Sequence, residues 1–190
     1  MGLEEMKAKK KRKKRNRLIF RTLVLAVMLI AVVYALVTNL QEETSVYEIG
    51  DKAPDFQLEQ INPNNDRETI RLNDMQGKGV MLNFWGTWCE PCKDEMPYMQ
   101  KLYPKYKDQG IEIVAVSLDG TELVVHNFIN EYDLTFPVPH DKKDQVRELY
   151  SIGPMPTTYF IDPEGTIVEK VEGALSLEHL EDHLKEIQPE

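Results

Sequence analysis

The chain contains two cysteines, Cys89 and Cys92, and only two residues separate them. A short apolar run at residues 80–85 predicts a buried strand before the pair, and helix-like spacing at residues 91–106 predicts a helix after it. Cys89 is therefore expected at a helix N-terminus, where free N–H groups and the helix dipole stabilise a thiolate. Pro91 suits the first turn of such a helix. The spacing lets the sulfurs close and reopen a short ring, so the pair predicts thiol–disulfide exchange.

Two other interpretations of the cysteine pair compete with redox chemistry. One is an inert disulfide, but a bridge across so short a loop constrains the unfolded chain very little and stabilises the fold poorly. The other is half of a zinc site completed by His179 and His183, which lie four residues apart in a predicted helix. The long gap between the two halves is unlike zinc-finger spacing, and a surface histidine pair fits better. No metal and no cofactor is expected.

Two acidic residues near the cysteines are expected to influence the thiols. Glu95 follows Cys92 by three residues and so takes a neighbouring position on the predicted helix. A carboxylate there disfavours the thiolate and raises the thiol pKa, and it can also carry a proton during exchange. Glu90, between the cysteines, acts in the same direction. The alternative is that both are solvated acids that merely suit a helix N-terminus.

The elements that must position this pair alternate between strands and helices. The predicted strands after residue 79 are 80–85, 111–118, 157–161 and 166–171, and the predicted helices are 91–106, 122–132, 145–150 and 177–187. Turn-forming residues at 162–165 mark the last two strands as a hairpin. This order is typical of an α/β fold with a mixed sheet. A body of about 140 residues is large enough for one hydrophobic core.

Charge divides the chain into two unlike parts. Residues 1–40 contain ten Lys and Arg against two Glu, a balance of +8, whereas residues 41–190 carry a balance of −17. The acidic body repels phosphate groups, so binding to nucleic acid is not expected. Two cysteines also exclude a small scaffold held by several disulfides.

Nine of the basic residues lie between positions 7 and 17, and a mainly apolar stretch from 18 to 37 follows, with Arg21 near its start. As a helix its 20 residues would measure about 30 Å, the thickness of the hydrocarbon core of a membrane. The positive-inside rule then predicts four segments: a cytoplasmic stub at 1–17, a transmembrane signal-anchor at 18–38, a linker at 39–48 and an extracytoplasmic domain at 49–190. A cleaved signal peptide is the alternative, because residues 33–35 resemble a cleavage site.

The sequence resembles the thioredoxin superfamily in three places. They are Asn83-Phe-Trp-Gly-Thr-Trp-Cys-Glu-Pro-Cys92, then Glu95-Met-Pro97, and later Gly153-Pro-Met-Pro-Thr-Thr158. With the N-terminal anchor and the Ala53-Pro-Asp-Phe opening, it is most similar to the membrane-anchored ResA type of thiol-disulfide oxidoreductase. The resemblance implies a thioredoxin-like mixed sheet flanked by helices. It also implies an added N-terminal β-hairpin at residues 54–72 and a central insertion at about 119–150.

The same resemblance implies roles for individual residues. Cys89 is the exposed attacking thiol, Cys92 resolves the mixed disulfide, and Glu95 tunes the two thiols. Pro156 follows a cis peptide bond and faces the cysteines, so that the backbone of Met155 can pair with an incoming peptide. Trp88 is either part of the substrate-binding surface or a residue without such a role, and the sequence leaves this open.

The resemblance further implies a substrate and an electron donor. The substrate is the Cys-x-x-Cys-His disulfide of apocytochrome c, which must be reduced before haem attachment, and the donor is a CcdA-like membrane thiol carrier. Alternatives are an oxidase or a reductase of another extracytoplasmic disulfide. A thiol peroxidase fits less well, because Thr87 stands two rather than three residues before Cys89. A Sco-like copper chaperone also fits less well, because its cysteines would be spaced by three residues.

Overall fold

The structure is a computed structural model that describes residue 16, residues 19–33 and residues 47–189. The chain divides into two compact units, Met1–Thr44 and Ser45–Glu190, and each is described by itself. In the first unit, residues 19–33 are helical, and all of their large apolar side chains are exposed. Within the described residues, no helix combines the length and the apolar character needed to cross a membrane. Most of the predicted stub and linker, and part of the predicted anchor, lie outside the described residues.

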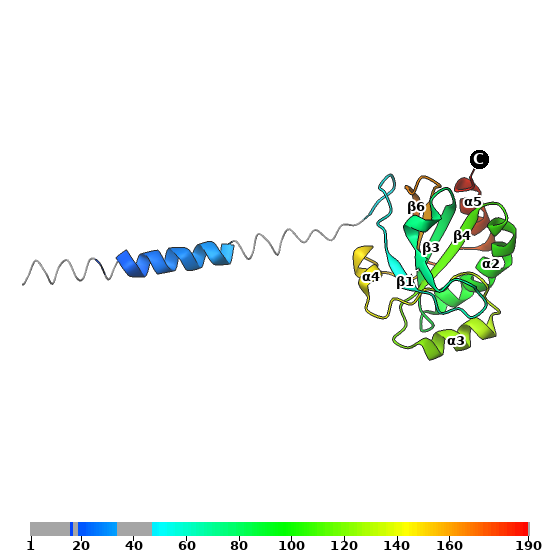
Figure 1. Ribbon diagram of the computed structural model, residues 1–190, viewed down its shortest axis with the longest axis horizontal. Helices are drawn as coiled ribbons and strands as arrows, with labels where there is room; N and C mark the ends of the chain where they lie inside the picture. Colours follow the sequence, from blue (N-terminus) through cyan, green and yellow to red (C-terminus); the bar gives the residue numbers. More distant parts are fainter. Residues whose placement is uncertain (1–15, 17–18, 34–46, 190) are drawn as a thin grey trace, which may run out of the picture. The chain divides into compact units, whose positions relative to one another are not determined.

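A four-stranded sheet forms the centre of the second unit, with the strand order β4-β3-β5-β6 (Figure 1). The strands are β3 (Gly79–Trp85), β4 (Ile111–Ser117), β5 (Thr157–Ile161) and β6 (Ile167–Glu172). β3 pairs in parallel with β4 and antiparallel with β5, which in turn pairs antiparallel with β6. The predicted mixed sheet is therefore confirmed. Both β3 and β4 are buried along their whole length, which explains their nearly continuous apolar sequences.

Helices cover both faces of this sheet. One face packs against α2 (Glu90–Lys107), α3 (Glu122–Glu131) and α5 (Leu177–Glu186), and the other packs against α4 (Gln145–Leu149) and the 3₁₀ helix η1 (Leu72–Met75). Side chains alternate along β3, so Met81 and Trp85 join the α2 side of the core, whereas Leu82 and Phe84 join the opposite side. By the same alternation Asn83 faces α2.

The N-terminal hairpin occupies the predicted place, and the segment predicted as a central insertion contains two helices. β1 (Gln57–Glu59) pairs antiparallel with β2 (Thr69–Arg71), and the insertion contains α3 and α4. The predicted second strand of the hairpin ran to Leu72, but Leu72 instead begins η1, because it and Met75 are both buried one 3₁₀ turn apart. The side-chain amide of Asn62 donates to the carbonyls of Leu134 and Phe136, which ties the hairpin to the insertion.

Candidate active site

Cys89 and Cys92 lie where β3 leads into α2, and they form a disulfide with their Cα atoms 5.3 Å apart. Cys89 is the N-cap of α2, and the backbone N–H of Cys92 donates to Cys89 Sγ at 3.3 Å. Pro91 occupies the first turn, as predicted. Because the N-terminal N–H groups of a helix favour negative charge, this geometry stabilises a thiolate on Cys89 once the disulfide is reduced.

The two sulfurs differ in their access to solvent. Cys92 is fully buried, whereas Cys89 retains 6% of its surface. Cys89 is thus the more accessible cysteine. It is nevertheless nearly buried, whereas the resemblance predicted an exposed thiol. The reason is that its sulfur is bonded to Cys92 and that its N–H closes a turn onto the carbonyl of Gly86 at 3.0 Å.

A buried carboxylate fixes the loop that leads into the cysteines. Asp119, which is almost completely buried, accepts hydrogen bonds from the backbone N–H of Thr87 at 3.0 Å and from the Thr87 hydroxyl at 2.6 Å. Ser117 Oγ donates to the same carboxylate at 3.1 Å, and the backbone carbonyl of Asp119 contacts His140 Nε2 at 2.6 Å. Sequence reasoning gave Asp119 and His140 no role, because Thr87 lies 32 residues from Asp119 and Asp119 lies 21 residues from His140.

The two tryptophans that flank the cysteines have opposite environments. Trp85 is completely buried, donates from Nε1 to the carbonyl of Ala115 and packs on Phe128 with ring centroids 4.9 Å apart. Trp88 is 66% exposed, which leaves its ring available to a partner. Gly86 permits this arrangement, because a Cβ at that position would lie 2.7 Å from Trp88 Nε1.

Glu95 is completely buried one turn after Cys92, so it is not a solvated acid. Its Oε1 accepts a hydrogen bond from Asn83 Nδ2 at 2.7 Å, and its Oε2 accepts one from the backbone N–H of Leu175 at 3.1 Å. Burial raises the pKa of Glu95 to about 7, although the hydrogen bonds from Leu175 and Asn83 act in the opposite direction. This carboxyl group can therefore bind or release a proton at neutral pH. Sequence reasoning found Glu95 but not its two partners.

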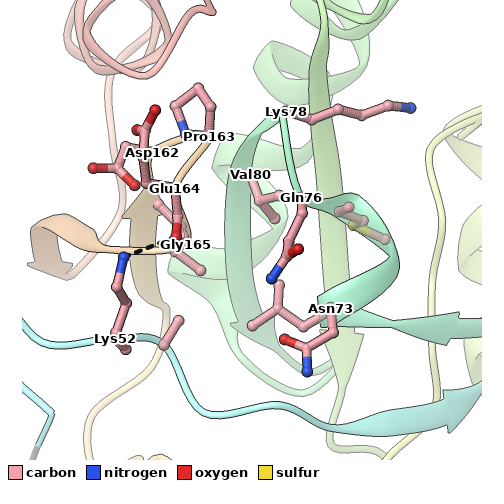
Figure 2. A pocket seen from close by; sticks show the side chains of 13 residues that line it. Lys52, Asn73, Gln76, Lys78, Val80, Asp162, Pro163, Glu164 and Gly165 are labelled. Carbon is pink, nitrogen blue, oxygen red and sulfur yellow. Dashed lines mark hydrogen bonds between the residues drawn. The ribbon is translucent and has the colours of Figure 1, made fainter.

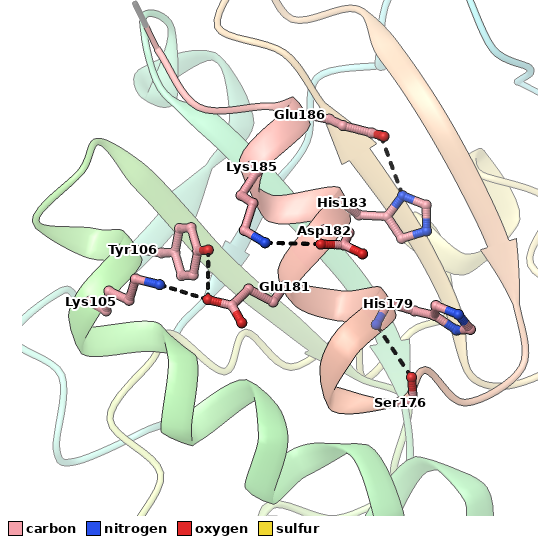
Figure 3. A network of polar contacts seen from close by, with 9 residues as sticks. All are labelled: Lys105, Tyr106, Ser176, His179, Glu181, Asp182, His183, Lys185 and Glu186. Carbon is pink, nitrogen blue, oxygen red and sulfur yellow. Dashed lines mark hydrogen bonds and ion pairs between the residues drawn. The ribbon is translucent and has the colours of Figure 1, made fainter.

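Leu175 directly precedes α5, and polar contacts cap this helix and hold it against α2 (Figure 3). Ser176 caps α5 by accepting from the backbone N–H of His179. Glu181 of α5 pairs with Lys105 of α2 at 2.6 Å and accepts from the hydroxyl of Tyr106 at 3.1 Å. These contacts fix the start of α5, and with it the Leu175 N–H that reaches Glu95.

His183 contacts Glu186 at 3.5 Å and lies against the ring of Phe160. Neither cysteine is among these contacts of His183. Within the described part of the chain, no cluster of three or more His, Cys, Asp or Glu side chains is arranged to hold a metal ion.

Glu90 differs from Glu95 in its surroundings. Its side chain is exposed and pairs with Lys93 at 3.0 Å on the outer surface of α2. For Glu90 the alternative of a solvated first-turn acid therefore describes what is seen. The two acidic residues near the cysteines thus differ in their surroundings: Glu95 is buried and has a raised pKa, whereas Glu90 is exposed and paired with Lys93.

Met155 and Pro156 precede β5, and the peptide bond between them is cis. Met155 is partly buried and packs against the core cluster that contains both cysteines and Trp85. Pro156 is buried, and its carbonyl accepts from the N–H of Gly173 at 2.8 Å. The structure thus packs Met155 against the cluster that contains the cysteines.

Two hollows of the second unit differ in their position relative to the redox motif. A hollow of about 290 Å³ is lined by Thr87 and Lys93 from the motif and by residues of α3 and its C-terminal end. A second hollow of about 260 Å³, shown in Figure 2, is lined by Val80 at the start of β3, by Ile161 at the end of β5, and by Lys52 and Lys78. It therefore lies at the end of the sheet opposite to the cysteines.

Comparisons with known proteins agree with this geometry. A protein-family profile described as the AhpC/TSA family matches residues 49–170. The chain is 60% identical over 190 residues to a thiol-disulfide oxidoreductase ResA of Oceanobacillus iheyensis, which covers all of this chain and 99% of that protein. It is also 46% identical over 176 residues to a ResA of Bacillus cereus, which covers 93% of this chain and 99% of that protein.

Solved structures show the same fold. A putative thiol:disulfide interchange protein DsbE from Chlorobium tepidum aligns with a TM-score of 0.68 at 34% identity, and covers 74% of this chain and 98% of that one. StoA from Bacillus subtilis aligns with a TM-score of 0.60 at 29% identity, and covers 68% of this chain and 96% of that one. The predicted thioredoxin-like fold is therefore confirmed.

Proposed function

The chain belongs to the AhpC/TSA family and is a thiol-disulfide oxidoreductase of the kind named ResA, and we propose that its Cys89–Cys92 pair works as an extracytoplasmic reductase. The substrate in this proposal is the Cys-x-x-Cys-His disulfide of apocytochrome c. The observation that supports the proposal most strongly is the arrangement of a cysteine N-cap, a buried second cysteine and a buried carboxyl group within two turns of one helix.

The reaction begins with the reduced pair. The thiolate of Cys89, stabilised by the N-terminus of α2, attacks one sulfur of the substrate disulfide, and the other substrate sulfur leaves as a thiolate. Cys92 then attacks Cys89 Sγ, which releases the second substrate thiolate and leaves the Cys89–Cys92 disulfide. Two electrons pass to the substrate.

In this proposal Glu95 accepts and returns a proton during the exchange. Cys92 must lose its proton before it attacks, and the buried carboxylate of Glu95, one turn further along α2, is placed to accept it. A group whose pKa is about 7 is suited to accept and release a proton under neutral conditions. In the reverse step the same group returns a proton when the disulfide is reduced again.

Three residues around the motif are proposed to form the substrate-binding region. The exposed ring of Trp88 supplies an apolar surface beside Cys89. Met155 offers its backbone to an extended substrate segment, with Pro156 fixing the direction of the chain at that point. The packing of Met155 against the cluster that contains the cysteines supports this assignment.

A membrane anchor at residues 18–38 completes the proposal, with residues 1–17 in the cytoplasm and the domain from residue 49 on the other side. The helix at 19–33 supports it, because every large apolar side chain in that stretch is exposed and needs a nonpolar partner. Anchoring would also bring the domain to its proposed electron donor, a CcdA-like membrane thiol carrier that reduces the disulfide for the next cycle.

The direction of transfer and the target separate this proposal from its alternatives. An oxidase would use the same two cysteines but would pass its disulfide to reduced substrates. A reductase of another extracytoplasmic disulfide would act equally well on targets that lack the histidine. A thiol peroxidase would consume a hydroperoxide, and a copper chaperone would bind copper at the two thiols.

Trapping the mixed disulfide tests the proposal. The full-length Cys92→Ser variant, reduced and mixed with an oxidised Cys-x-x-Cys-His peptide, should accumulate an adduct through Cys89, whereas Cys89→Ser should form none. Wild-type chain should reduce the peptide completely, and a matched peptide with Ala in place of His should react more slowly. Equal rates on both peptides would refute the proposed target, and oxidation of a reduced peptide by the chain would refute the proposed direction.

A further inference from the structure

Asn83 is the only polar residue of β3, and it lies in the centre of the buried sheet. One hydrogen of its Nδ2 bonds to Glu95 Oε1 at 2.7 Å, and the other bonds to Thr158 Oγ1 at 3.0 Å. Thr158 lies directly opposite Asn83 in the β3–β5 register. The amide group therefore connects the carboxyl of α2 to a hydroxyl on the neighbouring strand.

The other end of this amide has no partner. Among the residues that the structure describes, no donor reaches Asn83 Oδ1, although the atom is fully buried. Leaving a buried carbonyl oxygen without a hydrogen bond costs about 1–3 kcal/mol. Since a strand of otherwise apolar residues would avoid this cost with a nonpolar side chain, the amide calls for an explanation.

The chemistry of the carboxyl group supplies that explanation. An ionised carboxylate only accepts hydrogen bonds, whereas a protonated one also donates. A side-chain amide can serve both forms, because half a turn about its Cβ–Cγ bond exchanges the NH₂ donor for the carbonyl acceptor. After such a turn Oδ1 would face both Glu95 and Thr158, and the hydroxyl of Thr158 can rotate to donate where it had accepted.

We propose that Asn83 is a positioning residue for the proton of Glu95: its amide donates to the carboxylate and, turned over, accepts from the carboxylic acid. Thr158 follows each change by rotating its hydroxyl. The buried carboxyl group of Glu95 therefore has a hydrogen-bond partner in both protonation states. It can gain or lose its proton without losing that partner.

This inference rests on the proposed role of Glu95 as the proton acceptor of Cys92. The groups that act on the charge of Glu95 in this structure are Asn83 from β3 and the N–H of Leu175 before α5. While the disulfide is intact, Cys92 does not titrate. The oxidised chain therefore isolates the titration of Glu95 from that of the thiols.

Infrared difference spectroscopy of the oxidised full-length chain in detergent tests the inference between pH 5 and 9. The carboxylic acid band that disappears as pH rises is assigned to Glu95 by its absence from Glu95→Gln. In wild type this band should have the frequency of a hydrogen-bonded acid, and ¹³C labelling of Asn side chains should reveal an amide carbonyl band that shifts with the same midpoint. Asn83→Leu should raise the midpoint by at least one pH unit and move the acid band to the frequency of a free acid.

Three results would overturn the inference. The first is a Glu95 acid band at the free-acid frequency in wild type, and the second is a labelled amide band that does not change with pH, since in either case the amide would not accept the proton. The third is a folded Asn83→Leu variant with an unchanged midpoint. The two wild-type results need no variant to fold. They are also independent of the direction of electron transfer and of the target, so a failure here differs from a failure of the proposed function.

Discussion

Replacing Glu95 with Gln should remove a pH dependence from the stability of the domain. The pKa of Glu95 is raised by burial from an ordinary value of 4.5 to about 7, so the folded chain holds this proton more tightly than the unfolded chain. Between these two pH values the folded chain binds more protons, and the free energy of unfolding therefore falls as pH rises. Below pH 4.5 the contribution of the protonated group is fully present, and above pH 7 it is lost.

The size of the effect follows from the difference between the two pKa values. Each pH unit of that difference corresponds to about 1.36 kcal/mol, so the loss across the whole window amounts to about 3 kcal/mol. The Gln variant has no such loss. We therefore compare the free energies of unfolding of the wild type and Glu95→Gln at each pH. The difference between them should change by about 3 kcal/mol from pH 4 to pH 8, because only the wild type loses this stability.

Urea unfolding of the oxidised chains at a series of pH values measures this difference. Both tryptophans of the chain, Trp85 and Trp88, lie beside the site, so their fluorescence follows unfolding of this domain. Asp94→Asn is the matched control, because Asp94 is an exposed acid next to Glu95 on the same helix, and it should reproduce the wild-type pH profile. A wild-type profile parallel to that of Glu95→Gln from pH 4 to 8 would show that burial of this carboxyl group does not disfavour its charge.

Three further substitutions test the contacts around the site. Asp119→Asn should lower the free energy of unfolding by about 2 kcal/mol and slow disulfide exchange, because Thr87 loses its charged acceptor; urea titration and stopped-flow fluorescence measure the two effects. Trp88→Ala should change stability by less than about 0.5 kcal/mol but slow the reduction of protein disulfides more than that of a small disulfide. Tyr103→Phe should cost about 2 kcal/mol in urea titrations, because buried Glu112 loses a 2.6 Å hydrogen bond from the phenol; an unchanged midpoint would contradict this.

The fold could be predicted from the sequence to the extent that it depends on local pattern. Helical spacing at 91–106 corresponds to α2, and the apolar run at 80–85 corresponds to β3, because burial on both faces of a central strand requires nearly continuous apolar residues. The end of the hairpin was predicted less well. Leu72 fits the strand pattern and the 3₁₀ pattern equally, and only its packing decides between them.

The residues of the site also differ in how well the sequence predicts them. Cys89, Cys92 and Glu95 lie within seven consecutive residues, so their types and spacing are sufficient to find them. Asn83 and Leu175, which hold Glu95, lie 12 and 80 residues from it, and no local pattern connects them. The polar residue in the middle of an apolar strand was the one available signal for Asn83.

The reduction potential of the Cys89–Cys92 couple tests the central claim most directly. It can be measured by equilibrating the full-length chain with dithiothreitol buffers and titrating the free thiols. A reductase requires a value near that of thioredoxin, about −270 mV, because the dithiol must then give up its electrons readily. A value near that of DsbA, about −120 mV, would make the disulfide the reactive form and would contradict the account.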